Sequence, residues 1–202
     1  MFLYIAFIVY VNVSFIHIPK TGGTAIKHWR RLNKAHVQIY EKSTCNTTIW
    51  DINNKRYFGA TSRKHCLSNY KYIPKNSIRF CVIRNPIDRA ISSWKFRSCR
   101  NNANKYLQNM ITIGDADNHN IPQHNFAQYC DVHLCYENIQ SEFSQFAKKY
   151  FPHLENKTNL HLKNKNRCTQ NITLTKSSIL QLRSIYFLDF LLWDKICQKT
   201  TA

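Results

Sequence analysis

The stretch Phe15-Ile16-His17-Ile18-Pro19-Lys20-Thr21-Gly22-Gly23-Thr24 passes from an apolar run into a loop that contains two glycines. Val13 to Ile18 predicts a buried strand, and Thr24 to Leu32 predicts a helix because its apolar side chains recur at helical spacing. Gly22 and Gly23 let the backbone turn sharply and approach a ligand closely. A strand, loop and helix in this order direct several backbone N–H groups and a helix N-terminus toward one point, which suits a phosphate.

The side chains of this loop strengthen the prediction of an anion site. Lys20 adds a mobile positive charge, and Thr21 and Thr24 add hydroxyl donors. The order differs from a Walker A loop, in which the lysine follows the glycines. An ordinary strand-to-helix turn that uses glycine for its backbone conformation is the structural alternative.

A second segment of the same kind begins at Ile78. Ile78 to Ile83 predicts another short apolar strand, and Pro86 suits the first turn of the helix that follows. Arg84 stands at the strand end and Ser92 two turns into the helix, so a guanidinium and a hydroxyl can reach one phosphate. The structural alternative is that Arg84 caps the strand and Ser92 is a small packing residue.

Both segments resemble the sulfotransferases that use 3′-phosphoadenosine-5′-phosphosulfate (PAPS), and particularly the Golgi carbohydrate enzymes of heparan and chondroitin type. Residues 17–24 match that family's 5′-phosphosulfate motif, His-Ile-Pro-Lys-Thr-Gly-Gly-Thr, throughout. Residues 84–92 match its 3′-phosphate motif, Arg-Asn-Pro-x-x-Arg-x-x-Ser. Weaker likeness continues through 132–139 and 185–190, so the resemblance extends from about residue 13 to about residue 197.

The resemblance implies a fold and a donor site. The fold is α/β, with three layers in which helices flank a central parallel sheet, as in P-loop NTPases. Lys20 has the catalytic role of stabilising the leaving group, and Arg84 and Ser92 hold the 3′-phosphate. No metal is expected, and the product is 3′-phosphoadenosine-5′-phosphate (PAP). The residues implied for the 5′-phosphosulfate are Pro19, Lys20, Thr21, Gly22, Gly23 and Thr24.

The catalytic base is less well defined by the resemblance. Some relatives use a histidine that follows a glycine, about twenty residues before the 3′-phosphate arginine, but here Thr61 or Ser62 stands at that place. His65 follows shortly after, and Glu41 lies about where other relatives have a glutamate. His65 and Glu41 are therefore the two candidate bases, and an inactive or differently organised site stays open.

Two further motif residues have expected roles. Arg89 falls off the apolar face of its predicted helix, where it contacts the nucleotide or pairs with Asp88 or another surface acid. His17 belongs to the first motif, and we expect its role to be structural.

Composition favours a globular, strongly basic protein. The chain has 202 residues, which suits one domain over residues 1–202, and 44% are apolar. Its net charge of +18 attracts polyanions. An anionic glycan acceptor is favoured over nucleic acid, largely because the resemblance implies it, and no zinc-finger, RNA-recognition or basic-zipper pattern occurs. The oligomeric state is left open.

The apolar and polar patterns alternate between strands and helices, which predicts a parallel sheet with helices on both faces. Ligands of such sheets bind beyond the carboxyl ends of the strands, where both motifs fall. The polar composition of residues 43–55 predicts a loop. The further strands are expected at 36–40, 56–61 and 131–136, and the further helices at 86–97, 103–111, 139–150 and within 176–198.

Eight cysteines form an even set, which suits a disulfide-bearing domain of the Golgi or secretory lumen. Cys81 lies in a predicted core strand and is expected to be a small buried thiol. A zinc site is disfavoured because the cysteines and histidines lack the usual ligand spacing.

The segment 1–12 is apolar, and its role is open. Met1 to Val11 is shorter than the roughly 20 residues of a membrane-spanning helix, and it lacks the basic start of a signal peptide. Membrane contact through it, a start truncated relative to the family, a viral or microbial source and a cytosolic protein all remain open.

Three functions are therefore weighed. The favoured one is transfer of a sulfuryl group from PAPS to a carbohydrate hydroxyl. A non-catalytic nucleotide- or polyanion-binding protein that keeps the fold is the alternative, motivated by the missing histidine near Thr61. A P-loop phosphotransferase is disfavoured because the lysine precedes the glycines.

Overall fold

The structure is a computed structural model, and its description covers a defined part of the chain. The described residues are 12–40, 42–51, 56–64, 73–97, 99, 102–109, 119–162, 168, 170 and 172–198. Within these ranges, only the backbone is described for residues 40, 42–51, 56–64, 97 and 109.

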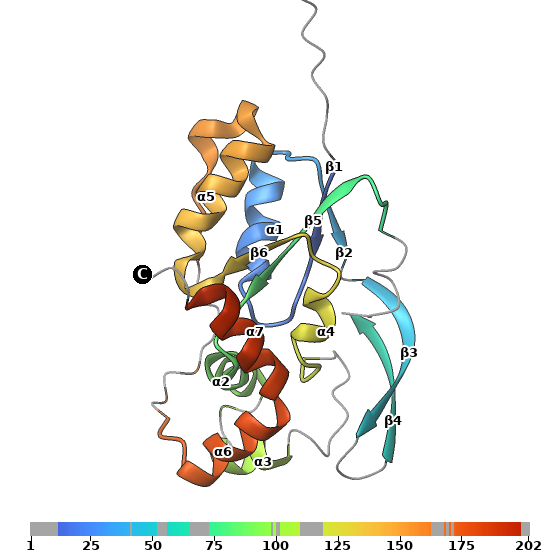
Figure 1. Cartoon of the computed structure of the whole chain (residues 1–202), viewed down its shortest axis with the longest axis vertical. Coiled ribbons are helices and arrows are strands. Elements are labelled where there is room, and N and C mark those ends of the chain that lie inside the picture. Colours follow the sequence, from blue (N-terminus) through green and yellow to red (C-terminus); the bar gives the residue numbers. More distant parts are fainter. Residues whose placement is uncertain are drawn as a thin grey trace, which may run out of the picture.

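A parallel sheet of four strands forms the centre of the molecule (Figure 1). Its strands are β2 (Val37–Tyr40), β1 (Asn12–Ile16), β5 (Ser77–Ile83) and β6 (Val132–Cys135), in that spatial order. Each neighbouring pair runs parallel. The predicted α/β class with a parallel sheet is therefore confirmed. The strands β1 and β5, which precede the two motifs, are neighbours in this sheet.

Alternate side chains of the two central strands enter two separate cores, as the period of a strand requires. Phe15 and Phe80 belong to the core that α1 (Gly23–Leu32) and α5 (Ile139–Tyr150) cover. Ile16 and Ile83 belong to the core on the other face. That second core is covered by α4 (His124–Ala127) and α7 (Phe187–Cys197). Helices therefore cover both faces of the sheet, and the predicted three layers are confirmed.

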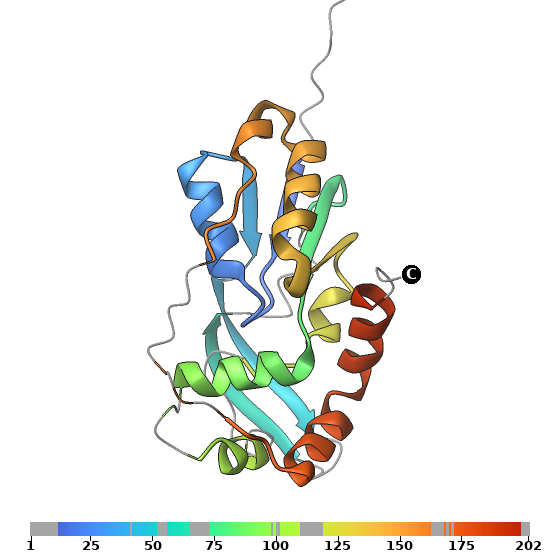
Figure 2. The same ribbon diagram turned by 90° about the vertical axis from the view of Figure 1, so that its left-hand side faces the viewer.

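The first core contains a cluster of packed aromatic rings. The Trp29 indole meets the Phe143 ring edge to face, with 4.9 Å between the centroids, and the Phe80 and Phe146 rings lie 4.4 Å apart. The Trp29 N–H donates to the Lys157 carbonyl, so its polar atom is satisfied. Lys157 closes the 3₁₀ segment η3 (Pro152–Lys157), which follows α5. Figure 2 shows α1 and α5 on the same face of the sheet.

Three helices, α2 (Pro86–Arg97), α3 (Ala103–Asn109) and α6 (Lys176–Ile185), gather beyond the carboxyl end of β5. Ala90, Leu107 and Leu182 pack together there, one from each helix. Tyr186 and Phe190 join them from the end of α6 and from α7. The ends of β1 and β5, where both motifs lie, therefore face a separate helical layer.

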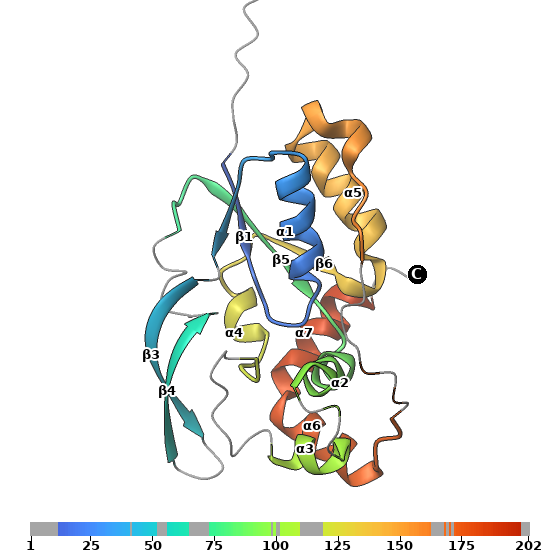
Figure 3. The same cartoon turned by 180° about the vertical axis from the view of Figure 1, so that it is seen from behind.

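A separate two-stranded antiparallel hairpin lies at one side of the molecule (Figure 3). It consists of β3 (Lys42–Asp51) and β4 (Arg56–Lys64), with Asn46 opposite Thr61 and Thr48 opposite Gly59. The prediction of a loop over residues 43–55 is therefore wrong for residues 43–51. Thr47 to Trp50 are β-branched and aromatic residues that favour strands, although their polar surroundings suggested a loop.

Disulfides connect elements that lie far apart in sequence. Among the described residues, the pairs are Cys81–Cys130, Cys99–Cys168 and Cys135–Cys197. Cys81 is therefore not the buried thiol that the sequence predicted, although its side chain is fully buried. The strand pattern predicts burial, but the partner comes from the segment that precedes β6, which only the tertiary structure brings close.

One ion pair joins β5 to the segment before β6. The Arg79 guanidinium donates to both carboxylate oxygens of Asp131, and the Arg79 backbone N–H donates to the same carboxylate. These hydrogen bonds lower the pKa of Asp131. The stabilisation that this carboxylate adds is therefore present above its unfolded pKa and is lost as pH falls through the lowered folded value.

Among the helices that the structure describes, none is both long and apolar enough to cross a membrane.

Replacing Phe143 by alanine tests the aromatic core. The side chain is fully buried between α5, Trp29 and the sheet, so Phe143→Ala should lower the free energy of unfolding by about 3–5 kcal/mol. Phe187→Ala removes the same ring from a position that is 58% exposed and should cost about 0.5 kcal/mol or less. Urea denaturation of both variants gives the comparison, and equal losses would contradict this core.

Candidate active site

The loop between β1 and α1, residues 17–22, is here called the lysine loop. Its path needs two residues with positive φ, Lys20 at 66° and Gly22 at 92°. The Thr21 hydroxyl donates to the Ile18 carbonyl over 2.9 Å, and Thr21 is fully buried. This hydroxyl therefore holds the loop's own shape, whereas the sequence suggested a donor to the ligand.

Two glycines at the end of the loop leave space for the rings beside them. A Cβ on Gly22 would lie 3.0 Å from a ring carbon of Tyr136, and a Cβ on Gly23 would lie 2.0 Å from Nε2 of His17. His17 is largely buried, and its ring packs directly beneath the start of α1. This contact is the structural role expected of His17, and it explains why residue 23 must be glycine.

The Lys20 side chain extends toward α2. Its Nζ lies 4.1 Å from the centroid of the Phe96 ring, a distance at which a cation and a ring attract each other. Phe96 is 58% exposed, so an apolar ring lies open to solvent beside this lysine.

Arg84 comes from the end of β5 and contacts the lysine loop directly. Its Nη1 donates to the Lys20 carbonyl over 3.1 Å, and its guanidinium lies 4.2 Å from the Tyr136 ring centroid. Tyr136 opens the 3₁₀ segment η2 (Tyr136–Asn138), and its ring thus lies between Gly22 and Arg84. The two predicted motifs therefore meet in one place.

The other predicted donor residues lie on the same segments. Pro19 is buried, Thr24 is exposed in the first turn of α1, and Ser92 is half-buried in α2. Their contact with a nucleotide remains a prediction.

The main chain of Arg84 is fixed by the amide of Gln123. Gln123 Oε1 accepts from the Arg84 N–H, and Gln123 Nε2 donates to the Arg84 carbonyl. The Gln123 side chain is fully buried. One amide thus satisfies both backbone groups at the point where β5 ends, a role that the sequence reasoning missed.

Arg89 lies inside the protein, which corrects the expected surface or nucleotide contact. It is 3% exposed, and it donates to the carbonyls of Pro19, His119 and Ile121 over 3.1, 2.9 and 2.7 Å. Its Nη1 lies 3.7 Å from the carboxylate of Asp189 on α7. The segment 119–123 and α7 cover the polar face of α2, which the helical period alone does not reveal.

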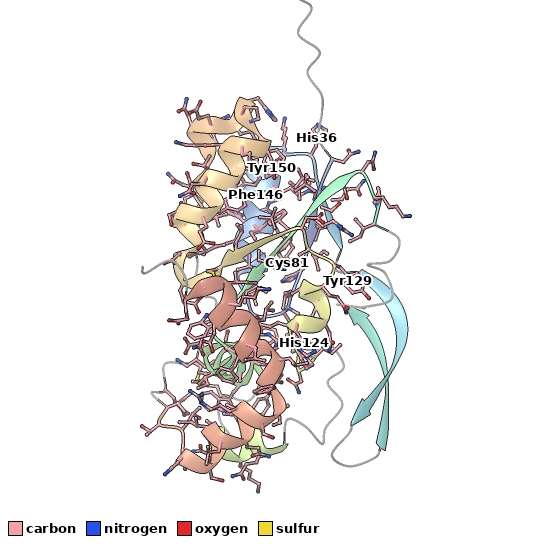
Figure 4. The ribbon with its side chains drawn as sticks, viewed as in Figure 1. His36, Cys81, His124, Tyr129, Phe146 and Tyr150 are labelled. Atoms are coloured by element: carbon pink, nitrogen blue, oxygen red, sulfur yellow. A yellow bond between two sulfur atoms is a disulfide. The ribbon has the colours of Figure 1, made fainter. Side chains whose placement is uncertain are left out.

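Asp189 is fully buried and orders the segment before α4. Its two oxygens accept from the backbone N–H groups of Gln123 and His124, and Nδ1 of His124 lies 2.8 Å from Oδ1. Figure 4 shows His124 between α4 and α7. A signal for this role existed in the sequence, because Asp189 is the one acid within Phe-Leu-Asp-Phe-Leu-Leu-Trp, and an acid in an apolar helix requires partners.

Two glutamates, one in η2 and one in the first turn of α5, accept hydrogen bonds from main-chain groups. Glu137 accepts from the N–H of Asn85 over 2.8 Å, and Glu142 accepts from the N–H of Cys135 over 2.6 Å. The Asn85 side chain in turn accepts from the N–H groups of Ile87 and Asp88, at the first turn of α2. These contacts fix the start of α2 against η2.

Neither predicted base can be placed. His65 and Glu41 lie outside the described residues. Thr61 and Ser62, which stand where a histidine was expected, belong to β4.

One group of metal-ligand type occurs among the described side chains. The ligand atoms of Cys81, Cys130 and His133 lie within 4.8 Å of one another. The two cysteines form a disulfide, and sulfur atoms in a disulfide are not the thiolates that bind metals. The expectation that the reaction needs no metal stays a prediction.

Gly23→Ala tests the contact between the loop and His17. The new Cβ would overlap the imidazole, so the free energy of unfolding should fall by about 1–3 kcal/mol. In the double variant with His17→Ala this loss should be much smaller, because the ring that is overlapped is gone. Chemical denaturation of the two single variants and the double variant measures the coupling, and strictly additive losses would exclude the contact.

The comparisons with known proteins agree with this geometry. A model of the sulfotransferase family matches residues 9–153, a range that contains both motifs, Gln123 and the whole parallel sheet. A search of curated proteins finds no match. The lysine loop after β1, the arginine at the end of β5 and the extent of the family match show that the chain belongs to the sulfotransferase family.

Proposed function

We propose that the protein transfers the sulfuryl group from PAPS to a hydroxyl of a carbohydrate. The observation that carries the proposal is the hydrogen bond between the Arg84 guanidinium and the Lys20 carbonyl. This hydrogen bond joins the lysine loop, which suits one phosphate, to Arg84, which suits a second phosphate. PAPS carries anionic groups at both ends of its ribose, and membership of the sulfotransferase family supports it as the donor.

The residues of the lysine loop suit the 5′-phosphosulfate. The positive φ of Gly22 turns the loop into α1, so that backbone N–H groups and the helix N-terminus can face a bound anion. Lys20 supplies a positive charge that can move from the Phe96 ring to a bound anion. The loop therefore fits the donor without a metal ion.

The residues of the second motif suit the 3′-phosphate. The Arg84 guanidinium presents donors in a planar fork, and its main chain is held by Gln123. Ser92, two turns into α2, supplies a hydroxyl. Binding of the 3′-phosphate at Arg84 and Ser92 fixes the nucleotide, so the sulfuryl group is oriented for in-line attack.

In the reaction, the acceptor oxygen forms a bond to sulfur while the bond from sulfur to the 5′-phosphate oxygen breaks. The electron pair of the broken bond stays on PAP, where Lys20 and the loop amides stabilise the charge. The acceptor proton passes to a base.

Charge and disulfides support the class of acceptor and the compartment. The net charge of +18 favours an anionic chain such as a glycosaminoglycan. The three disulfides among the described residues suit the Golgi or secretory lumen, where such acceptors are made.

A non-catalytic PAP-binding protein is the second candidate. It is favoured by one observation, the occurrence of Thr61 and Ser62 where some relatives have the basic histidine. Such a protein would bind PAP normally but would transfer no sulfuryl group to any glycan.

Calorimetric titration with PAP tests the donor site. We expect micromolar binding to the wild type, weakened at least tenfold in Lys20→Ala and in Arg84→Ala, because each variant loses charge-assisted hydrogen bonds. Arg30→Ala is the matched control, since it removes an exposed cation from the last turn of α1. Absence of binding to the folded wild type, or equal weakening by all three variants, would contradict the donor site.

A further inference from the structure

An aromatic ring lies exposed beside the lysine of the donor loop. Phe96, in the last turn of α2, is 58% exposed, and Lys20 Nζ lies 4.1 Å from the centroid of its ring. Single exposed apolar side chains are common on protein surfaces, so the exposure by itself indicates no function. The contact with the lysine that serves the leaving group is what gives this ring a place in the site.

The position of the Phe96 ring is fixed by the fold. Phe96 follows Ser92 by about one helical turn, so the two side chains lie on the same side of α2. Arg89, about two turns before Phe96 on that side, is buried and donates to the Pro19 carbonyl, which joins α2 to the lysine loop. The buried His119 ring packs against Phe96, with 5.5 Å between the centroids. The exposed ring therefore belongs to a packed interface between α2 and the lysine loop.

The geometry of sulfuryl transfer places the acceptor close to this ring. The acceptor oxygen must approach sulfur to about 3–3.5 Å before the new bond forms. In the proposed reaction Lys20 acts on the leaving oxygen, which is bonded to the same sulfur, so the attacking sugar comes within a few ångströms of Nζ. Phe96 is 4.1 Å from that nitrogen, and its ring is therefore within reach of the sugar that carries the attacking hydroxyl.

A phenyl ring suits the apolar side of a sugar. The C–H groups on one side of a pyranose carry a slight positive charge and the face of an aromatic ring is negative, so the two attract each other and exclude water. The hydroxyls and carboxylates around the edge of the sugar stay available to the basic protein. The same negative face attracts the Lys20 ammonium, so the lysine and a sugar compete for it.

We propose that Phe96 is the platform on which the acceptor sugar stacks, and that binding of the donor uncovers it. The proposal rests on the function proposed above. In the structure, Lys20 Nζ lies against the ring. The 5′-phosphosulfate draws Nζ away, because a charge-assisted hydrogen bond is stronger than an exposed contact between a cation and a ring. The uncovered ring then receives the sugar, so PAPS binds first and the glycan second.

Sulfuryl transfer from labelled PAPS to desulfated heparan and chondroitin chains by Phe96→Ala tests the stacking. We expect KM for the glycan to rise about 5- to 20-fold with kcat within about threefold of the wild type, because a stacked ring stabilises bound substrate and transition state alike. Calorimetric binding of PAP should be unchanged, or tighter by up to about fivefold, because Lys20 loses a competing contact.

Two further variants serve as controls. Phe96→Tyr keeps the ring and should keep the KM of the wild type. Phe187→Ala removes the same side chain at the same exposure of 58%, but from α7, and should leave KM unchanged.

Calorimetry with desulfated tetrasaccharides of the two chains tests the order of binding. The Kd of the tetrasaccharide is measured with and without saturating PAP, in the wild type and in Phe96→Ala. Bound PAP lowers the positive charge of the site equally in both proteins, so the comparison isolates the contribution of the ring. We expect the ratio of the Kd without PAP to the Kd with PAP to be at least about threefold larger in the wild type.

Four results would overturn the proposal. A KM for the glycan that stays within twofold of the wild type in Phe96→Ala excludes the platform, and so does an equal rise of KM in Phe187→Ala. PAP binding that weakens as much as transfer makes Phe96 a support for Lys20 and not a contact of the acceptor. Equal ratios of tetrasaccharide Kd in the two proteins contradict the uncovering of the ring by the donor.

Failure of the proposed function gives a different result. A wild type that binds PAP but sulfates neither chain contradicts carbohydrate sulfation itself, and the acceptor platform falls with it. Failure of the platform alone leaves transfer by the wild type intact.

Discussion

The buried Arg89 guanidinium, held by three carbonyls and the Asp189 carboxylate, is the interaction on which the arrangement of this site depends. A charge that is only 3% exposed is unfavourable unless it is paired and hydrogen-bonded. Here those partners come from the lysine loop, from residues 119–121 and from α7. Removing either charged group would leave the other buried without its counter-ion, so the loop and α7 depend on each other.

The same network extends to the end of β5. Asp189 fixes the backbone of Gln123, and the Gln123 amide fixes the backbone of Arg84. Arg84 returns to the lysine loop through its bond to the Lys20 carbonyl. Four segments that are distant in sequence therefore hold one another in place before a ligand binds. Such preorganisation is what transfer between two bound substrates requires, because small displacements of the reacting groups slow the reaction strongly.

The sequence contained enough to predict the sheet and both motifs. Apolar runs before Pro19 and Arg84 indicate buried strands, and the glycines and Pro86 indicate where each helix begins. The pairing of β1 with β5 places both motifs at one edge of the sheet, as expected for strands separated by helices. Each of these features depends on residues that are close together in the sequence, so the local pattern is enough to predict it.

The rest depends on contacts between distant segments. The helical period places Arg89 off the apolar face of α2, but nothing in that period shows that residues 119–121 and Asp189 cover it. Lys42–Asp51 forms a strand by pairing with β4, although its own composition is polar. Cys81 is recognisable as buried, yet its partner Cys130 is brought close only by the tertiary structure. The role of Gln123 is of the same kind.

A crystal structure of the protein with PAP tests the central claim most directly, namely that the lysine loop and Arg84 form one nucleotide site. The 5′-phosphate should lie against Lys20 and the N–H groups at the start of α1, with the 3′-phosphate on Arg84 and Ser92. The Arg89 contacts to Pro19 and His119 should be unchanged. PAP bound elsewhere, or bound with Arg84 turned away from both phosphates, would contradict the account.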